Sequence, residues 1–213
     1  MKSWLIFGGT FDPIHLGHLA IAMVVQNAFQ FDRVIFLPCK QPVLKQEASA
    51  SAKERLDMLT LALKDYPSYP FEIDSQELDR DSPSYMVTTL ENYRQTLTEP
   101  TALSLLMGMD SFQSLPKWHH WQQIINLANL LVVQRRAKSP FSEPLQSFLQ
   151  QHETQNKEDL KQRAAGCIYR FYSHVDYPQS STEIREKISK NKMLDKDLPE
   201  AVYQYIKNHQ LYI

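Results

Sequence analysis

Short apolar runs alternate with longer amphipathic stretches along most of this chain. The apolar runs have the length and composition of strands buried in a sheet, and they cover residues 4–7, 34–37, 103–107, 130–133 and 168–172. The amphipathic stretches predict helices over residues 16–29, 52–66 and 84–97, and a last helix that opens at Ser180. In the first of these helices, the inner face is expected to carry Leu19, Ala22 and Met23.

This alternation of strand and helix indicates βαβ units, and hence a parallel sheet with helices on both faces. We therefore predict an α/β fold built on a single Rossmann-like, doubly wound parallel sheet. Residues 1–213 contain no internal repeat and no low-complexity linker, so one domain is expected. Residues 137–165 are polar and rich in Gln, Glu and Lys, which predicts a helical, solvent-facing insertion on that domain.

Composition and charge exclude several classes of protein. Hydrophobic residues make up 43% and charged residues 22% of the chain, as in ordinary globular domains. The net charge of −1 gives no electrostatic reason to expect a nucleic acid or a membrane surface as partner. No run reaches the roughly 18 apolar residues of a membrane span, and the run at residues 4–7 is too short for a signal peptide.

The two cysteines, Cys39 and Cys167, form no CxxC pair and are expected to be free thiols in a reducing compartment. The cytoplasm is therefore the expected location. The sequence leaves the number of copies in the working assembly open, a homo-oligomer included.

The most informative stretch is residues 8–18, which read GGTFDPIHLGH between the first strand and the first helix. Ligands of α/β sheets bind where a strand hands over to a helix, and free amides at such a turn favour phosphate. His15 and His18 are three positions apart, so both face the same way on a first helical turn. Gly17 has no side chain and leaves room for a flat base or a phosphate.

Simpler interpretations of this stretch remain open at this point. A strand followed by two glycines and a helix is a common structural turn. A zinc site at His15 and His18 needs a third ligand at suitable spacing, and none is evident. The dinucleotide pattern GxGxxG and the P-loop pattern GxxxxGK[ST] do not occur, which disfavours both of those sites.

The whole string resembles the GGTFDPxHxGH signature of the nucleotidylyltransferase superfamily, and specifically of the bacterial nicotinate mononucleotide adenylyltransferases. The resemblance extends over most of the chain. It implies an enzyme of NAD biosynthesis that transfers AMP from ATP to nicotinate mononucleotide, giving deamido-NAD and pyrophosphate. It also implies Mg²⁺ that is held mainly by the substrate phosphates, with no metal ligands from the protein.

A second signature of that family, ISSTxIR, is similar to residues 179–185, which read QSSTEIR. Ser and Thr cap a helix start, and Arg185 adds a fixed positive charge, so the segment suits an anion. By itself the segment is better interpreted as an ordinary helix cap, and phosphate binding is favoured only together with the first motif. Residues 106–110, LMGMD, resemble the family's strand-end GxD, which implies that Asp110 faces ATP or the pyridine nucleotide.

Three further segments concern the acceptor and the triphosphate. Residues 118–121, WHHW, resemble the family's acceptor loop, in which Trp118 stacks on the pyridine ring. Residues 84–90, SYMVTTL, resemble SYTxxTL, with Met86 in place of a threonine. Residues 41–45, QPVLK, stand where the family has PPH[KR]. The cationic residue of that motif is retained as Lys45, while Leu44 replaces the histidine.

The resemblance assigns roles to three sets of residues. The catalytic set is His15, His18 and Arg185. The ATP-binding set is Gly8, Gly9, Thr10, Phe11, Gly17, Lys45, Asp110, Ser181, Thr182 and Arg185. The acceptor-binding set is Thr10, Tyr85, Met86, Trp118 and His119.

Other functions stay in competition with this one. The chain could be another adenylyltransferase, with phosphopantetheine or nicotinamide mononucleotide as acceptor, or a non-catalytic nucleotide-binding regulator. Residues 15–18, HLGH, and 187–190, KISK, also resemble the two signatures of class I aminoacyl-tRNA synthetases. The second of these lies inside a predicted helix, and the chain is too short for a tRNA-binding domain, so that interpretation is disfavoured.

Overall fold

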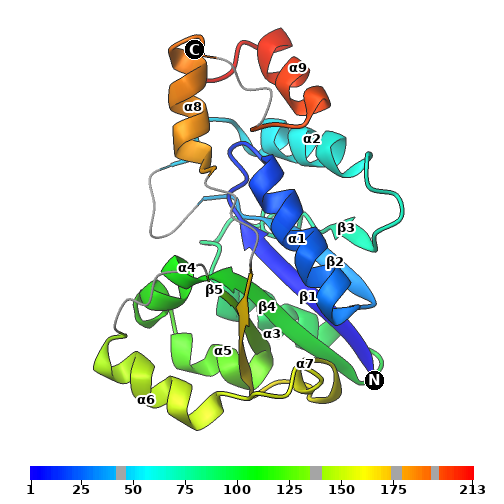
Figure 1. The fold of residues 1–213 in the computed structure, drawn as a ribbon, viewed down its shortest axis with the longest axis vertical. Helices are drawn as coiled ribbons and strands as arrows, with labels where there is room; N and C mark the ends of the chain where they lie inside the picture. The colour runs from blue at the N-terminus through cyan, green and yellow to red at the C-terminus, as the bar shows by residue number, and fades with distance from the viewer. Residues whose placement is uncertain (42–46, 135–140, 174–178, 193–196) are drawn as a thin grey trace.

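In a computed structural model of the chain, the residues described are 1–41, 47–134, 141–173, 179–192 and 197–213. Their strands form one parallel sheet in the order β3-β2-β1-β4-β5-β6 (Figure 1). The strands are β1 (Lys2–Gly9), β2 (Arg33–Pro38), β3 (Phe71–Ile73), β4 (Thr101–Gly108), β5 (Asn129–Gln134) and β6 (Ile168–Tyr172).

Both faces of the sheet are buried, because side chains alternate between two hydrophobic clusters along each central strand. In β1, Leu5 and Phe7 belong to one cluster and Ile6 to the other. The first cluster is covered by α1 (Leu16–Phe29), α2 (Ala52–Leu63), α7 (Asp159–Gln162), α8 (Ser181–Ser189) and α9 (Glu200–Asn208). The second is covered by α3 (Met86–Thr96), α4 (Met109–Ser114), α5 (Trp121–Leu127) and α6 (Glu143–His152).

The strand order positions the site. From β1 the chain runs outward to β2 and β3, and then returns to add β4 on the opposite side of β1. In sheets of this order, ligands bind beyond the carboxyl ends of the strands at the point where the order reverses. That point lies between the end of β1 at Gly9 and the end of β4 at Gly108.

The predicted fold class is confirmed, and the five predicted strands and the predicted helices are present. The helix over residues 16–29 has the predicted bounds, with Leu19 and Ala22 fully buried and Met23 only partly so. The pattern did not predict β3, α4, α5, α9 or the 3-10 turn η1 (Leu115–Lys117). Apart from α9, which has nine residues, these elements have only three to seven residues, so hydrophobic periodicity has few positions in which to show itself.

The prediction of a solvent-facing insertion at residues 137–165 is wrong for its described part. The segment does contain helices, α6 and α7, but Leu145, Phe148 and Leu149 of α6 are buried against the sheet. Leu160 of α7 is also fully buried, in the cluster on the opposite face. A few apolar residues at helical spacing within a polar segment are enough to form an inner stripe.

Two further sequence expectations concern the whole chain. Cys39 and Cys167 are both free thiols. Within the described ranges, no helix combines the length and the apolar character that crossing a membrane requires.

Candidate active site

The loop that follows β1 is shaped by a tight contact between Gly9 and Phe11. Phe11 has a positive φ of 49° and a side chain that is 1% exposed. A Cβ atom on Gly9 would lie 2.9 Å from the Phe11 ring, so only glycine leaves room for that ring. The ring packs edge-on against Phe7 and His18, at centroid distances of 5.6 and 5.1 Å. Burial of Phe11 therefore anchors the turn to the core.

His15 and His18 stand together at the start of α1, as their spacing predicts. His15 is the N-cap residue of the helix and is 5% exposed. The two rings are stacked, with centroids 3.7 Å apart and planes inclined by 29°. Imidazole rings can donate hydrogen bonds to an anion, so the pair suits a phosphate group.

The start of α8 packs onto the same loop from a distant part of the sequence. Ser180 caps the helix, its Oγ accepting the Glu183 amide at 3.2 Å. Ser181 Oγ donates to the carbonyl of Pro13 at 3.1 Å. Arg185 Nη1 donates to the carbonyl of Asp12 at 2.7 Å. The two sequence signatures therefore meet beyond the carboxyl end of β1.

Asp12 is the centre of this meeting point, and sequence reasoning did not select it. Its carboxylate is 3% exposed and accepts the amides of Ser49 at 2.7 Å and Ala50 at 3.1 Å. The Tyr212 hydroxyl donates to the same carboxylate at 2.7 Å. Arg185 Nη1 lies 3.7 Å from Asp12 Oδ2, in an ion pair that is longer than a hydrogen bond.

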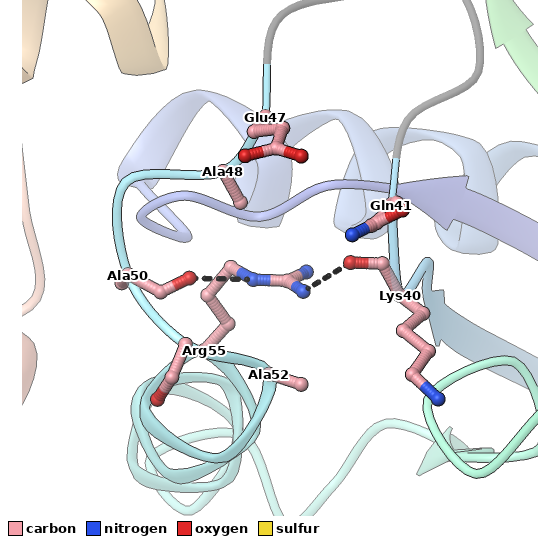
Figure 2. A pocket seen from close by; sticks show the side chains of 8 residues that line it. Lys40, Gln41, Glu47, Ala48, Ala50, Ala52 and Arg55 are labelled. Carbon is pink, nitrogen blue, oxygen red and sulfur yellow. Dashed lines mark hydrogen bonds between the residues drawn. The ribbon is translucent and has the colours of Figure 1, made fainter. Parts of the chain in front are cut away.

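A second arginine, Arg55 of α2, is buried and supports the turn from the other side. It is 1% exposed, and its guanidinium donates to four carbonyls in three separate segments. The acceptors are Thr10 O at 2.7 Å, Cys39 O at 2.7 Å, Lys40 O at 2.9 Å and Ala50 O at 3.3 Å. Figure 2 shows the guanidinium lying between Ala50 and Lys40 in the wall of a hollow of about 230 Å³. This charge fixes the turn without being exposed to a ligand.

The residues predicted to bind the acceptor gather at the starts of α3 and α5. Tyr85 is the N-cap residue of α3, and its ring stacks on His119 at a centroid distance of 4.2 Å. Met86 begins the helix, and its Cε lies 3.0 Å from the place where Gly8 would carry a Cβ. Trp118 closes η1 and is half-buried. The acceptor residues therefore reach the glycine turn at the end of β1.

A buried carboxylic acid lies behind the start of α3. Glu77 is 2% exposed, and Thr89 donates to its Oε1 at 2.6 Å. Burial raises the pKa of the Glu77 carboxyl above its usual range. Lys40 links this region to β2, because its amide donates to Ser84 Oγ at 3.2 Å.

Most of the predicted site residues thus lie in one region, although their roles stay predictions. The phosphate side holds Gly8, Gly9, Thr10, Phe11, His15, Gly17, His18, Ser181, Thr182 and Arg185. Asp110 is exposed in the first turn of α4, directly after β4. Lys45 lies outside the described residues, so the structure does not place it.

Sequence reasoning missed Asp12, Arg55 and Tyr212. A signal existed for Arg55, which shares the buried stripe of α2 with Met58, Leu59 and Ala62. An arginine on an apolar stripe indicates a buried charge with a structural or functional task. No group of three or more His, Cys, Asp or Glu side chains in the described parts of the chain could hold a metal ion.

Comparisons with known proteins agree with this geometry. The family model described as "Cytidylyltransferase-like" matches residues 6–187. A "Probable nicotinate-nucleotide adenylyltransferase" of Legionella pneumophila (strain Lens) is 45% identical, over 100% of both chains. A protein of the same name from Hahella chejuensis is 40% identical, over 98% of this chain and 94% of its own length.

Among solved structures, the fold is similar to that of the Plasmodium falciparum nicotinic acid mononucleotide adenylyltransferase complexed with NaAD. The TM-score is 0.74 at 16% identity, over 100% of this chain and 98% of that one.

Proposed function

The chain belongs to the cytidylyltransferase-like family and, within it, to the nicotinate-nucleotide adenylyltransferases, and we propose that it transfers the AMP part of ATP to nicotinate mononucleotide. The products are deamido-NAD and pyrophosphate. The observation that carries the proposal is the meeting of the stacked His15 and His18 with Arg185 at the end of β1. The acceptor residues adjoin the same turn, through the approach of Met86 to Gly8.

The reaction needs alignment and charge stabilisation more than proton transfer. The second pKa of a phosphate monoester is about 6, so the acceptor phosphate is largely dianionic at neutral pH and needs no general base. One of its oxygens forms a bond to the α-phosphorus of ATP. The bond from that phosphorus to the oxygen shared with the β-phosphate breaks, and pyrophosphate leaves with the electron pair. The protein must therefore bring two polyanions together in line.

Residues of the phosphate side meet this requirement. His15 and His18 stabilise the charge on the transferring phosphoryl group, and the backbone from Gly9 to Phe11 lines the turn below it. Arg185, with Ser181 and Thr182 at the start of α8, binds the β- and γ-phosphates together with Lys45. Mg²⁺ enters as part of the MgATP substrate, where it neutralises phosphate charge. We also propose the cytoplasm as the location of the protein, as expected from its sequence.

Residues of the acceptor side position the pyridine. Trp118 stacks on the ring, and the backbone amides of Met86 and His119 donate to its carboxylate. Because Met86 begins α3, the positive end of the helix dipole also faces the carboxylate. Tyr85 holds His119 in place through the stacking of their rings.

The test is a screen of acceptors with ATP and Mg²⁺, read as release of pyrophosphate. Nicotinate mononucleotide, nicotinamide mononucleotide and phosphopantetheine are compared at equal concentration, and a reaction without acceptor is the control. Release with nicotinate mononucleotide above the other two supports the proposal. Release with phosphopantetheine alone assigns the chain to another adenylyltransferase activity. Binding of ATP without release from any acceptor makes it a regulator instead.

A further inference from the structure

We propose that Tyr212 is a positioning residue of this site, whose hydroxyl holds the Asp12 carboxylate so that Arg185 stays available to the triphosphate of ATP. The inference rests on the proposed function, because it concerns the same phosphate-binding side. Tyr212 lies 200 positions from Asp12 in the sequence, and its hydroxyl is directed to the Asp12 carboxylate. It acts through two intermediate groups.

The first step is the contact between Tyr212 and Asp12. The Tyr212 hydroxyl donates to Asp12 Oδ1 at 2.7 Å, beside the Ala50 amide, which donates to the same oxygen at 3.1 Å. Tyr212 has a positive φ of 65°. That conformation is unfavourable for a tyrosine and persists only where the surroundings hold it. Burial and the neighbouring Asp12 raise the pKa of Tyr212, so its hydroxyl keeps its proton and remains a donor.

The second step is the effect of the Asp12 carboxylate on Arg185. Ser49 donates to Oδ2 while Ala50 and Tyr212 donate to Oδ1, and these three donors set the orientation of the carboxylate. In that orientation Oδ2 remains 3.7 Å from Arg185 Nη1. Arg185 is anchored to the Asp12 carbonyl, at 2.7 Å, but is only loosely paired with the carboxylate.

Loss of the Tyr212 hydroxyl changes this balance. Asp12 Oδ1 then keeps one of its two donors, and the carboxylate can turn to form a direct, charge-assisted bond with Arg185. Such a bond competes with the phosphates of ATP for the same guanidinium. The result is weaker binding of ATP, with little effect on the acceptor, most of whose predicted residues lie at the start of α3 and after η1 rather than beside Asp12.

The chain offers a matched control in Tyr205 of α9. Its hydroxyl also donates to a carboxylate, Asp57 Oδ2 of α2, at 3.0 Å. Tyr205 and Tyr212 thus make the same kind of hydrogen bond from neighbouring parts of the sequence. Asp57 is not part of the site. Tyr205→Phe therefore reports the structural cost of losing such a bond, and Tyr212→Phe reports the same cost together with any effect on the site.

The experiment compares steady-state kinetics of Tyr212→Phe, Tyr205→Phe and the unaltered protein. A hydrogen bond to a charged group contributes appreciably to stability, and only part of the contribution of this bond affects how strongly Arg185 binds ATP. We therefore expect Tyr212→Phe to raise KM for ATP about three- to tenfold. KM for nicotinate mononucleotide should stay unchanged in both variants. A purely structural role would lower the melting temperature and the amount of active protein without changing KM for ATP. An unchanged KM in Tyr212→Phe, or an equal rise in Tyr205→Phe, overturns the inference.

A double-mutant cycle tests the path through Arg185. In the background of Arg185→Gln, which cannot form the competing ion pair, Tyr212→Phe should have little further effect on ATP affinity. If Tyr212→Phe weakens ATP binding by the same factor in the Arg185→Gln protein and in the unaltered protein, the proposed path through Arg185 is overturned. Calorimetric titration with MgATP alone gives a second reading that does not depend on turnover. If the unaltered protein binds ATP but transfers AMP to no acceptor, the proposed function fails, while the titration still decides the role of Tyr212.

Discussion

Two stacked histidines at the start of α1, His15 and His18, are the residues for which we propose the most direct part in the chemistry. His18 lies against the ring of His15 and should matter most when negative charge develops on the transferring phosphoryl group. We expect His18→Ala to raise the barrier by about 2–4 kcal/mol, as for the loss of one preorganised donor. ATP binding should weaken much less. Turnover measured beside ATP affinity checks this, and near-normal turnover would remove His18 from the mechanism.

Glu77 makes the free energy of unfolding depend on pH, and the burial of its carboxyl determines the direction of that dependence. Burial raises its pKa in the folded protein above the usual 4.5, so the folded chain holds this proton more tightly than the unfolded chain. The contribution of Glu77 to stability is therefore complete at low pH and is lost as the pH rises through the folded pKa. Relative to Glu77→Gln, the unaltered protein should lose stability as the pH rises from the usual 4.5 towards neutrality.

Urea denaturation of both proteins across that range measures the difference. The glutamine keeps an oxygen that can accept the Thr89 hydroxyl, so packing is matched in the two proteins. A pH-independent difference would show that Glu77 titrates as it does in the unfolded chain.

Sequence could predict the residues that carry chemistry more readily than those that hold them in place. The string at residues 8–18 and the segment at residues 179–185 have recognisable residue types at fixed spacing. Asp12 sits inside the first string, but its partners, Ser49, Ala50 and Tyr212, depend on contacts that no local pattern encodes.

At the scale of the element, α2 acts as the support for the phosphate-binding turn. Arg55→Met would leave the carbonyls of Thr10, Cys39, Lys40 and Ala50 without this donor. We expect a loss of at least about 3 kcal/mol in the free energy of unfolding, because several buried acceptors lose their donor at once.

The matched control is Lys53→Met on the same helix. Lys53 forms an exposed pair with Asp57, which contributes at most about 0.5 kcal/mol. Chemical denaturation compares the two variants. Equal and small losses would mean that the carbonyls find other donors and that Arg55 is not the support of the turn.

The starts of α3 and α5 should decide which mononucleotide is used. In the proposed site the nicotinate carboxylate accepts from backbone amides, whereas the carboxamide of nicotinamide would place an NH₂ group against an NH. Loss of two charge-assisted bonds should lower kcat/KM for nicotinamide mononucleotide about a hundredfold or more. Since the amide at Met86 exists whatever the side chain, Met86→Thr should retain that preference. Equal kcat/KM values for the two mononucleotides would contradict the assignment.

Elements were predictable from sequence where they are long and periodic. The helix at residues 16–29 has the bounds that were predicted for it. In contrast, β3 has only three residues at the edge of the sheet, too few to show a hydrophobic periodicity in the sequence. The prediction for the polar segment at residues 137–165 was misleading because many of its described residues, from 141 to 165, do face solvent. Its buried apolar residues, Leu145, Phe148, Leu149 and Leu160, join the core.

For the molecule as a whole, alternation of strands and helices predicts a parallel sheet, but not the order of its strands. That order sets β1 beside β4 and so places the glycine turn and Asp110 at the same edge. In Figure 1, α8, α9 and α2 lie together at one end of the molecule, with α4 to α6 toward the other. The phosphate side of the site includes residues of α8, which belongs to the first group. The acceptor side lies on elements nearer to the second group, α4 to α6.

The contacts that fasten the first loop join residues 168, 173 and 200 positions apart. Contacts of such long range form late in folding, since the entropy of closing the intervening chain must be overcome first. A nascent chain can therefore build most of its sheet before the first loop is held by these contacts, and under our proposal its affinity for ATP would rise further once Tyr212 has been synthesised and has docked.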